Sequence, residues 1–339
     1  MFKESLSRKK IVILSFLSLF LIIGLVFFLL SQNKSFTFLS PLAKKSKTEE
    51  IKEKPLDKYT FKRLKKRKPQ VSEITLESTI NETPDFTSYI FTFESEGRKI
   101  SGMANIPFGE GPFPVILMLR GYVDLEIYQS GMGTQPSAEV YAQNGYLTLA
   151  PDFLGYGSSD MPPDDIWESR FLRSVNIIDL LNSIKTFPQA EVDKIAIWGH
   201  SNGGLSSLSI LEITGGEYPT TLWAPVSQFF PYDILFFTNE YDDKGKGIRK
   251  SLAEFEKDYD IDLYSFDEYL DWIEAPIQIH QGTADIFVPL IWSQNLVNNL
   301  NDFDKEVVFY TYPGADHQLN GAWDLVVQRD LNFFKERLK

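Results

Sequence analysis

The segment Gly199-His200-Ser201-Asn202-Gly203-Gly204 constrains the fold of this chain more than any other. It follows a short apolar run, 195–198, and precedes a second run, 205–213, that is rich in Leu, Ser and Ile. This succession predicts a strand, a very tight turn and a helix, with Ser201 at the apex of the turn. Glycines two residues before and after the serine suit such a turn, because a Cβ there would collide with the neighbouring strand or helix. We therefore predict a nucleophile elbow, with free helix N–H groups directed at whatever Ser201 attacks.

A serine nucleophile needs a base, and the chain contains three histidines. His200 lies inside the turn, where its side chain cannot swing back onto the neighbouring hydroxyl. His280 lies in a strand-like stretch, and we predict that it is a packed structural residue. His317 lies in a Gly/Pro loop directly after an apolar run, which is where a general base is usually placed. Asp285 follows the strand of His280 and lies between Ser201 and His317 in the chain.

Together, Ser201, Asp285 and His317 are the residue types that nucleophilic acyl transfer requires. The imidazole takes the serine proton and later returns it to the leaving group. The carboxylate fixes the imidazole tautomer and stabilises the imidazolium that forms. Taken singly, Ser201 could cap a helix, Asp285 could start a turn and His317 could be a surface loop residue. The order Ser, Asp, His and the placement of all three favour a catalytic triad.

The stretch from about residue 88 to the C-terminus resembles the α/β-hydrolase superfamily. Within it, the stretch is similar to the catalytic domain of the prolyl oligopeptidase family and to dienelactone-hydrolase-like enzymes. The resemblance implies that Ser201, Asp285 and His317 form the triad. The segments that carry it are 114–122, 150–159, the elbow, the Asp285 loop with Val288-Pro289, and the His317 loop.

The pattern of apolar runs predicts an α/β fold, a mostly parallel, doubly wound sheet with helices on both faces. A hairpin is predicted around Glu96-Gly97-Arg98, and the continuous apolar run 115–119 is typical of a buried parallel strand. The other predicted strands and helices cover 147–150, 137–144, 166–187 and 323–338.

The run 115–119 ends at Arg120-Gly121-Tyr122. In the resembled family this position usually reads His-Gly, followed by a residue whose backbone N–H helps to bind the oxyanion, so Arg120 is a departure from the pattern. We predict that the oxyanion hole consists of the N–H groups of Tyr122 and Asn202, with the Tyr122 hydroxyl as a further possible donor. The alternative is that Tyr122 is a buried aromatic residue.

Charge divides the chain into two parts. Residues 1–70 hold 17 basic and 5 acidic residues, whereas residues 71–339 hold 17 basic and 41 acidic residues, a formal charge of −24. An acidic domain of this kind argues against nucleic acid as a partner. The absence of cysteine excludes disulfides and thiolate metal sites.

Residues 11–30 contain no charged side chain, and twenty helical residues span about 30 Å, the thickness of the bilayer hydrocarbon core. We predict an uncleaved transmembrane anchor, with a cleaved signal peptide as the competing interpretation. The basic residues at 1–10 predict that the N-terminus is cytoplasmic and that the enzyme domain lies outside the cytoplasm. Residues 31–70 predict a basic, flexible linker, and 71–339 the catalytic domain.

Residues 226–274 are rich in aromatic side chains and form a predicted insertion near the elbow. The insertion could be a lid or a substrate pocket, or it could be ordinary core packing. Asp258, Asp260 and Asp262 have the spacing of a calcium loop, but Leu263 stands where the loop needs glycine and no glutamate closes it. We expect no metal and no cofactor.

These features predict a membrane-anchored serine hydrolase that cleaves a peptide or ester bond through an acyl-Ser201 intermediate. Because about 45 residues separate the predicted anchor from the first core strand, we expect no substrate-gating propeller, which favours esters or short peptides. The competing hypothesis is a non-catalytic binding domain on a hydrolase scaffold. The oligomeric state stays open.

Overall fold

The structure is a computed structural model that describes residues 53–339. Residues 54–339 form one compact unit. Among residues 53–339, none of the helices has both the length and the hydrophobicity that a membrane-spanning helix requires. The predicted N-terminal end 1–10, anchor 11–30 and most of the linker lie outside the described residues.

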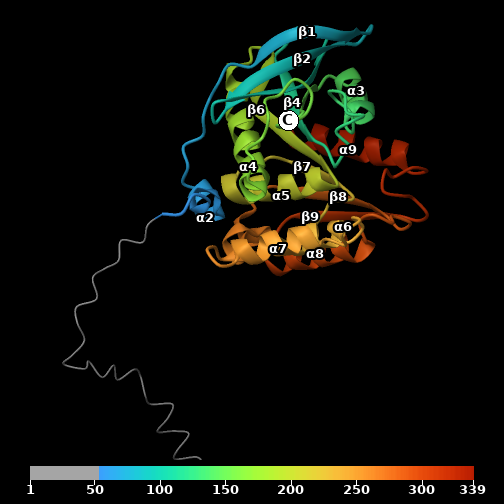
Figure 1. The fold of residues 1–339 in the computed structure, drawn as a ribbon. Coiled ribbons are helices and arrows are strands. Elements are labelled where there is room, and N and C mark those ends of the chain that lie inside the picture. The colour runs from blue at the N-terminus through green and yellow to red at the C-terminus, as the bar shows by residue number, and fades with distance from the viewer. Residues whose placement is uncertain (1–52) are drawn as a thin grey trace, which may run out of the picture. The chain divides into compact units, whose positions relative to one another are not determined.

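A nine-stranded sheet forms the centre of the described unit, in the order β1-β2-β3-β5-β4-β6-β7-β8-β9 (Figure 1). β1 to β3 are antiparallel to their neighbours, and β5, β4 and β6 to β9 are parallel to one another. The predicted mostly parallel sheet is therefore confirmed. The strands are β1 Thr75–Glu82, β2 Phe86–Ser95, β3 Arg98–Pro107, β4 Phe113–Leu119, β5 Leu147–Pro151, β6 Ala190–His200, β7 Thr220–Trp223, β8 Ile277–Gly282 and β9 Val307–Tyr312.

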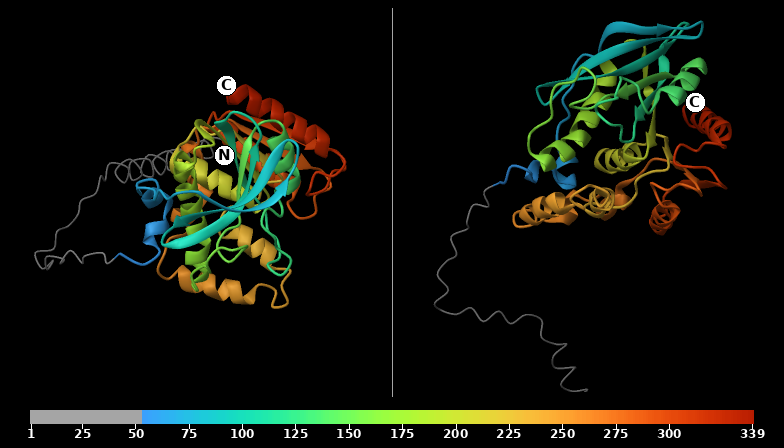
Figure 2. Two further views of the ribbon diagram at one scale, coloured as in Figure 1. Left: turned by 90° about the horizontal axis from the view of Figure 1, so that it is seen from above. Right: turned by 45° about the vertical axis from the view of Figure 1, so that its right-hand side comes forward.

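Helices cover both faces of this sheet (Figures 1 and 2). Along β4, Val115, Leu117 and Leu119 belong to the apolar core that includes α4, α5 and α8, whereas Ile116 and Met118 belong to the core that includes α3 and α9. This alternation is the two-residue period of a strand buried on both sides. The helices are α2 Phe61–Leu64, α3 Gln135–Gln143, α4 Ile166–Ser183, α5 Asn202–Thr214, α6 Tyr232–Thr238, α7 Lys246–Phe255, α8 Leu290–Asp302 and α9 Trp323–Arg337, and the 3-10 turns are η1 Asp57–Tyr59, η2 Ile184–Thr186, η3 Ile261–Tyr264 and η4 Phe266–Trp272.

The predicted hairpin joins β2 to β3. Its two loop residues, Glu96 and Gly97, have φ values of 49° and 69°. Two successive positive φ values are typical of a type I′ turn, whose twist matches that of the flanking strands. The register from Phe86↔Pro107 to Ser95↔Arg98 follows from this turn.

The predicted flexible linker extends too far along the chain. Residues from Lys54 onward belong to the compact unit, and Tyr59, Phe61 and Leu64 are buried in its core. Arg67 forms an ion pair with the fully buried carboxylate of Asp179 at 2.6 Å. The compact unit therefore begins at about residue 54 rather than 71, because Tyr59, Phe61 and Leu64 bury against the rest of it.

The insertion between β7 and β8 contributes to the core. Phe230, Phe255 and Tyr264 surround Phe171 of α4, with ring centroids 5.6, 5.9 and 4.7 Å away. Of the two roles considered for this segment, core packing therefore applies to these rings. Phe230 and Tyr264 also line a cavity that is described below.

Candidate active site

Ser201 occupies the turn between β6 and α5, as predicted. Its backbone has φ 55° and ψ −119°. A non-glycine residue rarely adopts this conformation, which costs on the order of 1–3 kcal/mol and persists only where the surroundings enforce it. It is the backbone of a nucleophile elbow, in which the hydroxyl stands at the carboxyl edge of the sheet.

Three glycines make the elbow sterically possible. A Cβ on Gly199 would lie 2.4 Å from the Ser207 hydroxyl, and one on Gly204 would lie 2.5 Å from the Cβ of Pro225. A Cβ on Gly203 would lie 1.7 Å from the carbonyl oxygen of Leu119. The predicted collisions with the neighbouring strand and helix are therefore present at these positions.

Asp285 and His317 come together in the loops after β8 and β9. Nδ1 of His317 lies 2.8 Å from Oδ2 of Asp285. The other carboxylate oxygen accepts hydrogen bonds from the backbone N–H groups of Phe287 and Val288, each at 2.9 Å. Burial favours a raised pKa for Asp285, but the hydrogen bonds from His317 and from these N–H groups outweigh it and hold the pKa below its usual value. Asp285 is therefore a charged acceptor that orients the imidazole.

His200 links the elbow to the His317 loop. Its Nε2 donates to the backbone carbonyl of His317 at 3.0 Å, and the two ring centroids are 4.7 Å apart. Burial, and then the nearness of His317, lower the pKa of His200 to about 4, so this ring is neutral at neutral pH. The sequence showed only that His200 is not the base. Its contact with the His317 loop depends on the fold.

Within residues 53–339, neither the Ser201 hydroxyl nor Nε2 of His317 makes a hydrogen bond. Ser201 is 8 % exposed, and the side chain of His317 is 11 % exposed. In enzymes without substrate, a nucleophile and its base often approach within hydrogen-bond distance only in the reacting complex. The structure thus joins Asp285 to His317 directly, and joins Ser201 to them through its neighbour His200.

The segment after β4 lies against the elbow. A Cβ on Gly121 would lie 2.9 Å from Cβ and 3.4 Å from Oγ of Ser201, so the backbone that leads into Tyr122 passes directly beside the hydroxyl. In the described residues the N–H groups of Tyr122 and Asn202 have no acceptor. The hydroxyl of Tyr122 donates to Asp124 at 2.6 Å, so it is engaged elsewhere. Tyr122 is 68 % exposed, and the alternative of a buried aromatic residue is therefore wrong.

Arg120 holds this segment by hydrogen bonds. Its guanidinium donates to the carbonyl oxygens of Gly121 and Asp152 at 2.9 and 2.8 Å, and it lies over the rings of Tyr128 and Tyr156. The arginine therefore fixes the backbone that precedes the predicted oxyanion donor. The sequence alone identified Arg120 as a departure from the family pattern but did not indicate these contacts.

Asp152, which directly follows β5, is a structural residue. Its fully buried carboxylate accepts hydrogen bonds from the hydroxyl groups of Ser101, Tyr128 and Ser130 at 2.6–2.7 Å. His280 is also structural: it is fully buried and lies 2.6 Å from the Tyr312 hydroxyl and 3.0 Å from Asp330. This second His–Asp pair joins β8 to α9.

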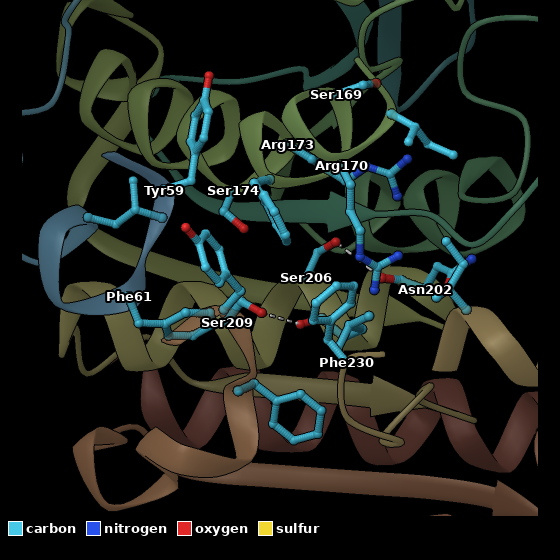
Figure 3. A pocket seen from close by; sticks show the side chains of 17 residues that line it. Tyr59, Phe61, Ser169, Arg170, Arg173, Ser174, Asn202, Ser206, Ser209 and Phe230 are labelled. Atoms are coloured by element: carbon cyan, nitrogen blue, oxygen red, sulfur yellow. Dashed lines mark hydrogen bonds between the residues drawn. The ribbon is translucent and has the colours of Figure 1, made fainter. Parts of the chain in front are cut away.

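Two cavities flank the elbow. One, of about 300 Å³, reaches Asn202, and Figure 3 shows the side chains of α4, α5 and the insertion around it. The other, of about 480 Å³, reaches His200 and the loop after His317. Among residues 53–339, no group of three or more His, Asp and Glu side chains could hold a metal ion.

Three solved structures share this fold at low identity. An acetyl xylan esterase from Thermoanaerobacterium matches with a TM-score of 0.60 and 17% identity over 82% of this chain and 93% of its own. An acylaminoacyl peptidase from Pyrococcus horikoshii gives 0.57 and 18% over 75% of this chain and 42% of its own. An S-formylglutathione hydrolase from Agrobacterium tumefaciens gives 0.56 and 16% over 79% of this chain and 100% of its own. No curated protein sequence matches the chain.

The sequence model of the prolyl oligopeptidase family matches residues 136–339. This range contains the elbow and both loops that carry Asp285 and His317. It covers more than half of the chain, and the fold agrees with it. The chain therefore belongs to the prolyl oligopeptidase family of α/β-hydrolases.

Proposed function

We propose that this protein is a serine hydrolase that cleaves the acyl bond of an ester or a short peptide through an acyl-Ser201 intermediate. The observation that carries the proposal is the hydrogen bond between Asp285 and His317 beside a serine held in a strained elbow. Family membership supports the same reaction class. Solved relatives of similar fold include both an acetyl xylan esterase and an acylaminoacyl peptidase, which is why both bond types stay in the proposal.

In the proposed reaction, His317 donates Nδ1–H to Asp285 and presents an unprotonated Nε2. Nε2 takes the proton of the Ser201 hydroxyl as Oγ attacks the substrate carbonyl carbon. The N–H groups of Tyr122 and Asn202 stabilise the oxyanion, each contributing about 3 kcal/mol. The imidazolium then gives its proton to the leaving alcohol or amine. Water, activated by the same base, attacks the acyl-enzyme and releases the acid and free Ser201.

The fixed position of the Asp285–His317 pair matters for the rate. Two backbone N–H groups hold the carboxylate, and His200 holds the carbonyl of His317. A base whose ring and backbone are both held loses little freedom when the hydroxyl approaches. Arg120 acts in the same way on the segment that leads to Tyr122.

We propose further that residues 11–30 anchor the enzyme in a membrane, with its catalytic unit outside the cytoplasm. The twenty uncharged residues and the basic residues that precede them support this proposal. In fractionated cells, the full-length protein should stay with membranes after alkaline carbonate extraction, and external protease should digest it in intact spheroplasts. Recovery of the enzyme in the carbonate supernatant would contradict the anchor.

A fluorophosphonate probe tests the catalytic proposal directly. Full-length wild-type protein should be labelled on Ser201 and should hydrolyse 4-nitrophenyl acyl esters or aminoacyl amides. Ser201→Ala should lose labelling and turnover while keeping the wild-type Tm. Ser207→Ala, the same substitution six residues further along, within α5, should keep both.

Labelling that persists in Ser201→Ala would contradict the assignment of the nucleophile. A folded wild-type protein that neither labels nor turns over any substrate of the two series would favour the competing hypothesis, a non-catalytic binding domain.

A further inference from the structure

The cavity beside Asn202 contains a charge that the proposed reaction does not use. α4, α5, the segment around Tyr59 and Phe61, and the insertion line this cavity of about 300 Å³ (Figure 3). Asn202 directly follows the proposed nucleophile, and consecutive Cα atoms are about 3.8 Å apart. A substrate can therefore extend from this cavity to Ser201 and place its reacting carbonyl there.

Two arginines of α4 line the cavity, and their environments differ. Arg170 forms an ion pair with the buried carboxylate of Asp233. Arg173 forms no hydrogen bond and no ion pair with any residue in 53–339. Its contact is with the face of the Phe153 ring, at 4.9 Å from the centroid.

This contact does not compensate the half-buried guanidinium for the hydration that it loses. A cation–π interaction contributes about 1–2 kcal/mol, whereas a charged group with five unused N–H donors loses more than that when it leaves water. Burial, and then the nearness of Arg120 and Arg170, lower the pKa of Arg173 to about 10. The group is still protonated at neutral pH, so the cavity keeps one unpaired positive charge.

Within residues 53–339, no carboxylate lies within ion-pair distance of Arg173. Asp233 pairs with Arg170, and the carboxylate of Asp152 accepts three hydroxyl donors. Arg120 donates to two carbonyl oxygens. An anion that satisfies Arg173 must therefore come from outside the described unit.

We propose that Arg173 binds a carboxylate of the substrate, so that the preferred substrates are esters or short peptides that carry a free carboxylate. The inference rests on the proposed hydrolase function. A single carboxylate matches the single unpaired charge, whereas a phosphate monoester would leave excess negative charge in a half-buried cavity. The planar guanidinium can bind both carboxylate oxygens.

Matched pairs of chromogenic substrates test this proposal with the full-length enzyme. For the acyl side, 4-nitrophenyl hydrogen glutarate is compared with its neutral methyl ester; for the leaving-group side, 4-acetoxybenzoate is compared with its methyl ester. We expect wild-type kcat/KM to favour the acid over the neutral ester by about tenfold or more in at least one pair. High salt should reduce this ratio.

Arg173→Met should lower kcat/KM for the preferred acid by the same factor and leave the neutral ester within twofold. Arg173→Lys, which keeps the charge, should restore part of the preference. Glutarate alone should raise the Tm of the wild type and not that of Arg173→Met, and this readout does not depend on turnover.

The outcomes distinguish the inference from the proposed function. Neutral esters that are hydrolysed without any preference for either acid would overturn the role of Arg173 and leave the hydrolase intact. Equal losses on acid and ester in Arg173→Met would also overturn it, because they would indicate a structural role. Absence of hydrolysis and of Ser201 labelling would remove both proposals.

Discussion

The neutral, buried His200 makes the stability of this protein depend on pH in a calculable way. Its Nε2–H donates to the carbonyl of His317, and the residue is 6 % exposed. In the folded protein its pKa is about 4, against 6.5 for an ordinary histidine, because burial and then His317 disfavour the charged ring. Between these two values the unfolded chain binds a proton that the folded chain does not. The contribution of His200 to the free energy of unfolding is therefore fully present above pH 6.5, and it is lost progressively as the pH falls toward 4.

The size of this effect follows from the two pKa values. One pKa unit corresponds to about 1.4 kcal/mol. Once His200 is fully protonated in the unfolded chain and in the folded protein, the free energy of unfolding is lower by about 3 kcal/mol. Between pH 7.5 and pH 5, the same relation predicts a loss of about 2 kcal/mol from His200 alone. This loss adds to the contributions of all other titrating groups.

His200→Gln removes the titration and keeps a side-chain amide that can donate to the His317 carbonyl. The free energy of unfolding is measured by urea denaturation at pH 7.5 and pH 5, followed by tryptophan fluorescence. From pH 7.5 to pH 5 the wild type should lose about 2 kcal/mol more than the variant. Equal losses in the two proteins, within about 0.5 kcal/mol, would refute the view that His200 is neutral in the folded state.

Three other substitutions also concern stability. Glu212 is fully buried, neither of its carboxyl oxygens has a hydrogen-bond partner in the described residues, and burial raises its pKa well above the usual value. The folded chain therefore keeps a proton that the unfolded chain releases, so the free energy of unfolding decreases as the pH rises above about 4.5. Glu212→Gln should remove this decrease, as measured by urea denaturation at pH 5 and pH 8. An equal decrease in the wild type and the variant would contradict the prediction. Gly203→Ala would place Cβ 1.7 Å from the Leu119 carbonyl oxygen and should abolish folding, judged by soluble yield and circular dichroism. Gly97→Ala, with no atom within 4 Å of the new Cβ, should cost only about 1 kcal/mol, and a folded, active Gly203→Ala protein would show that the elbow can shift.

The parts of the fold that sequence reasoning predicted are those with a local physical cause. The hairpin follows from the backbone that Glu96 and Gly97 must adopt, and the buried parallel strand β4 follows from an unbroken apolar run. The elbow follows from glycines at positions where any Cβ would collide with neighbouring atoms. Such constraints act over a few residues and are visible in the printed sequence.

The error in the linker has an equally specific reason. Between residues 54 and 70, basic residues outnumber the apolar ones, which is the composition of a solvated spacer. Tyr59, Phe61 and Leu64 nevertheless bury against the domain, and Arg67 meets the buried Asp179. Neither partner surface can be recognised before α4 and η4 are in place.

The candidate site divides in the same way. The sequence by itself determined the residue types Ser201, Asp285 and His317, their order and the turn that presents the serine, because each depends on short-range backbone geometry. Only the tertiary structure decided that His200 holds the His317 loop, that Arg120 holds the Gly121 backbone, and that Arg173 faces a cavity without a partner. These environments depend on groups that are distant in the chain or on a cavity between elements. They form only when folding brings the carboxyl edge of the sheet and the covering helices together.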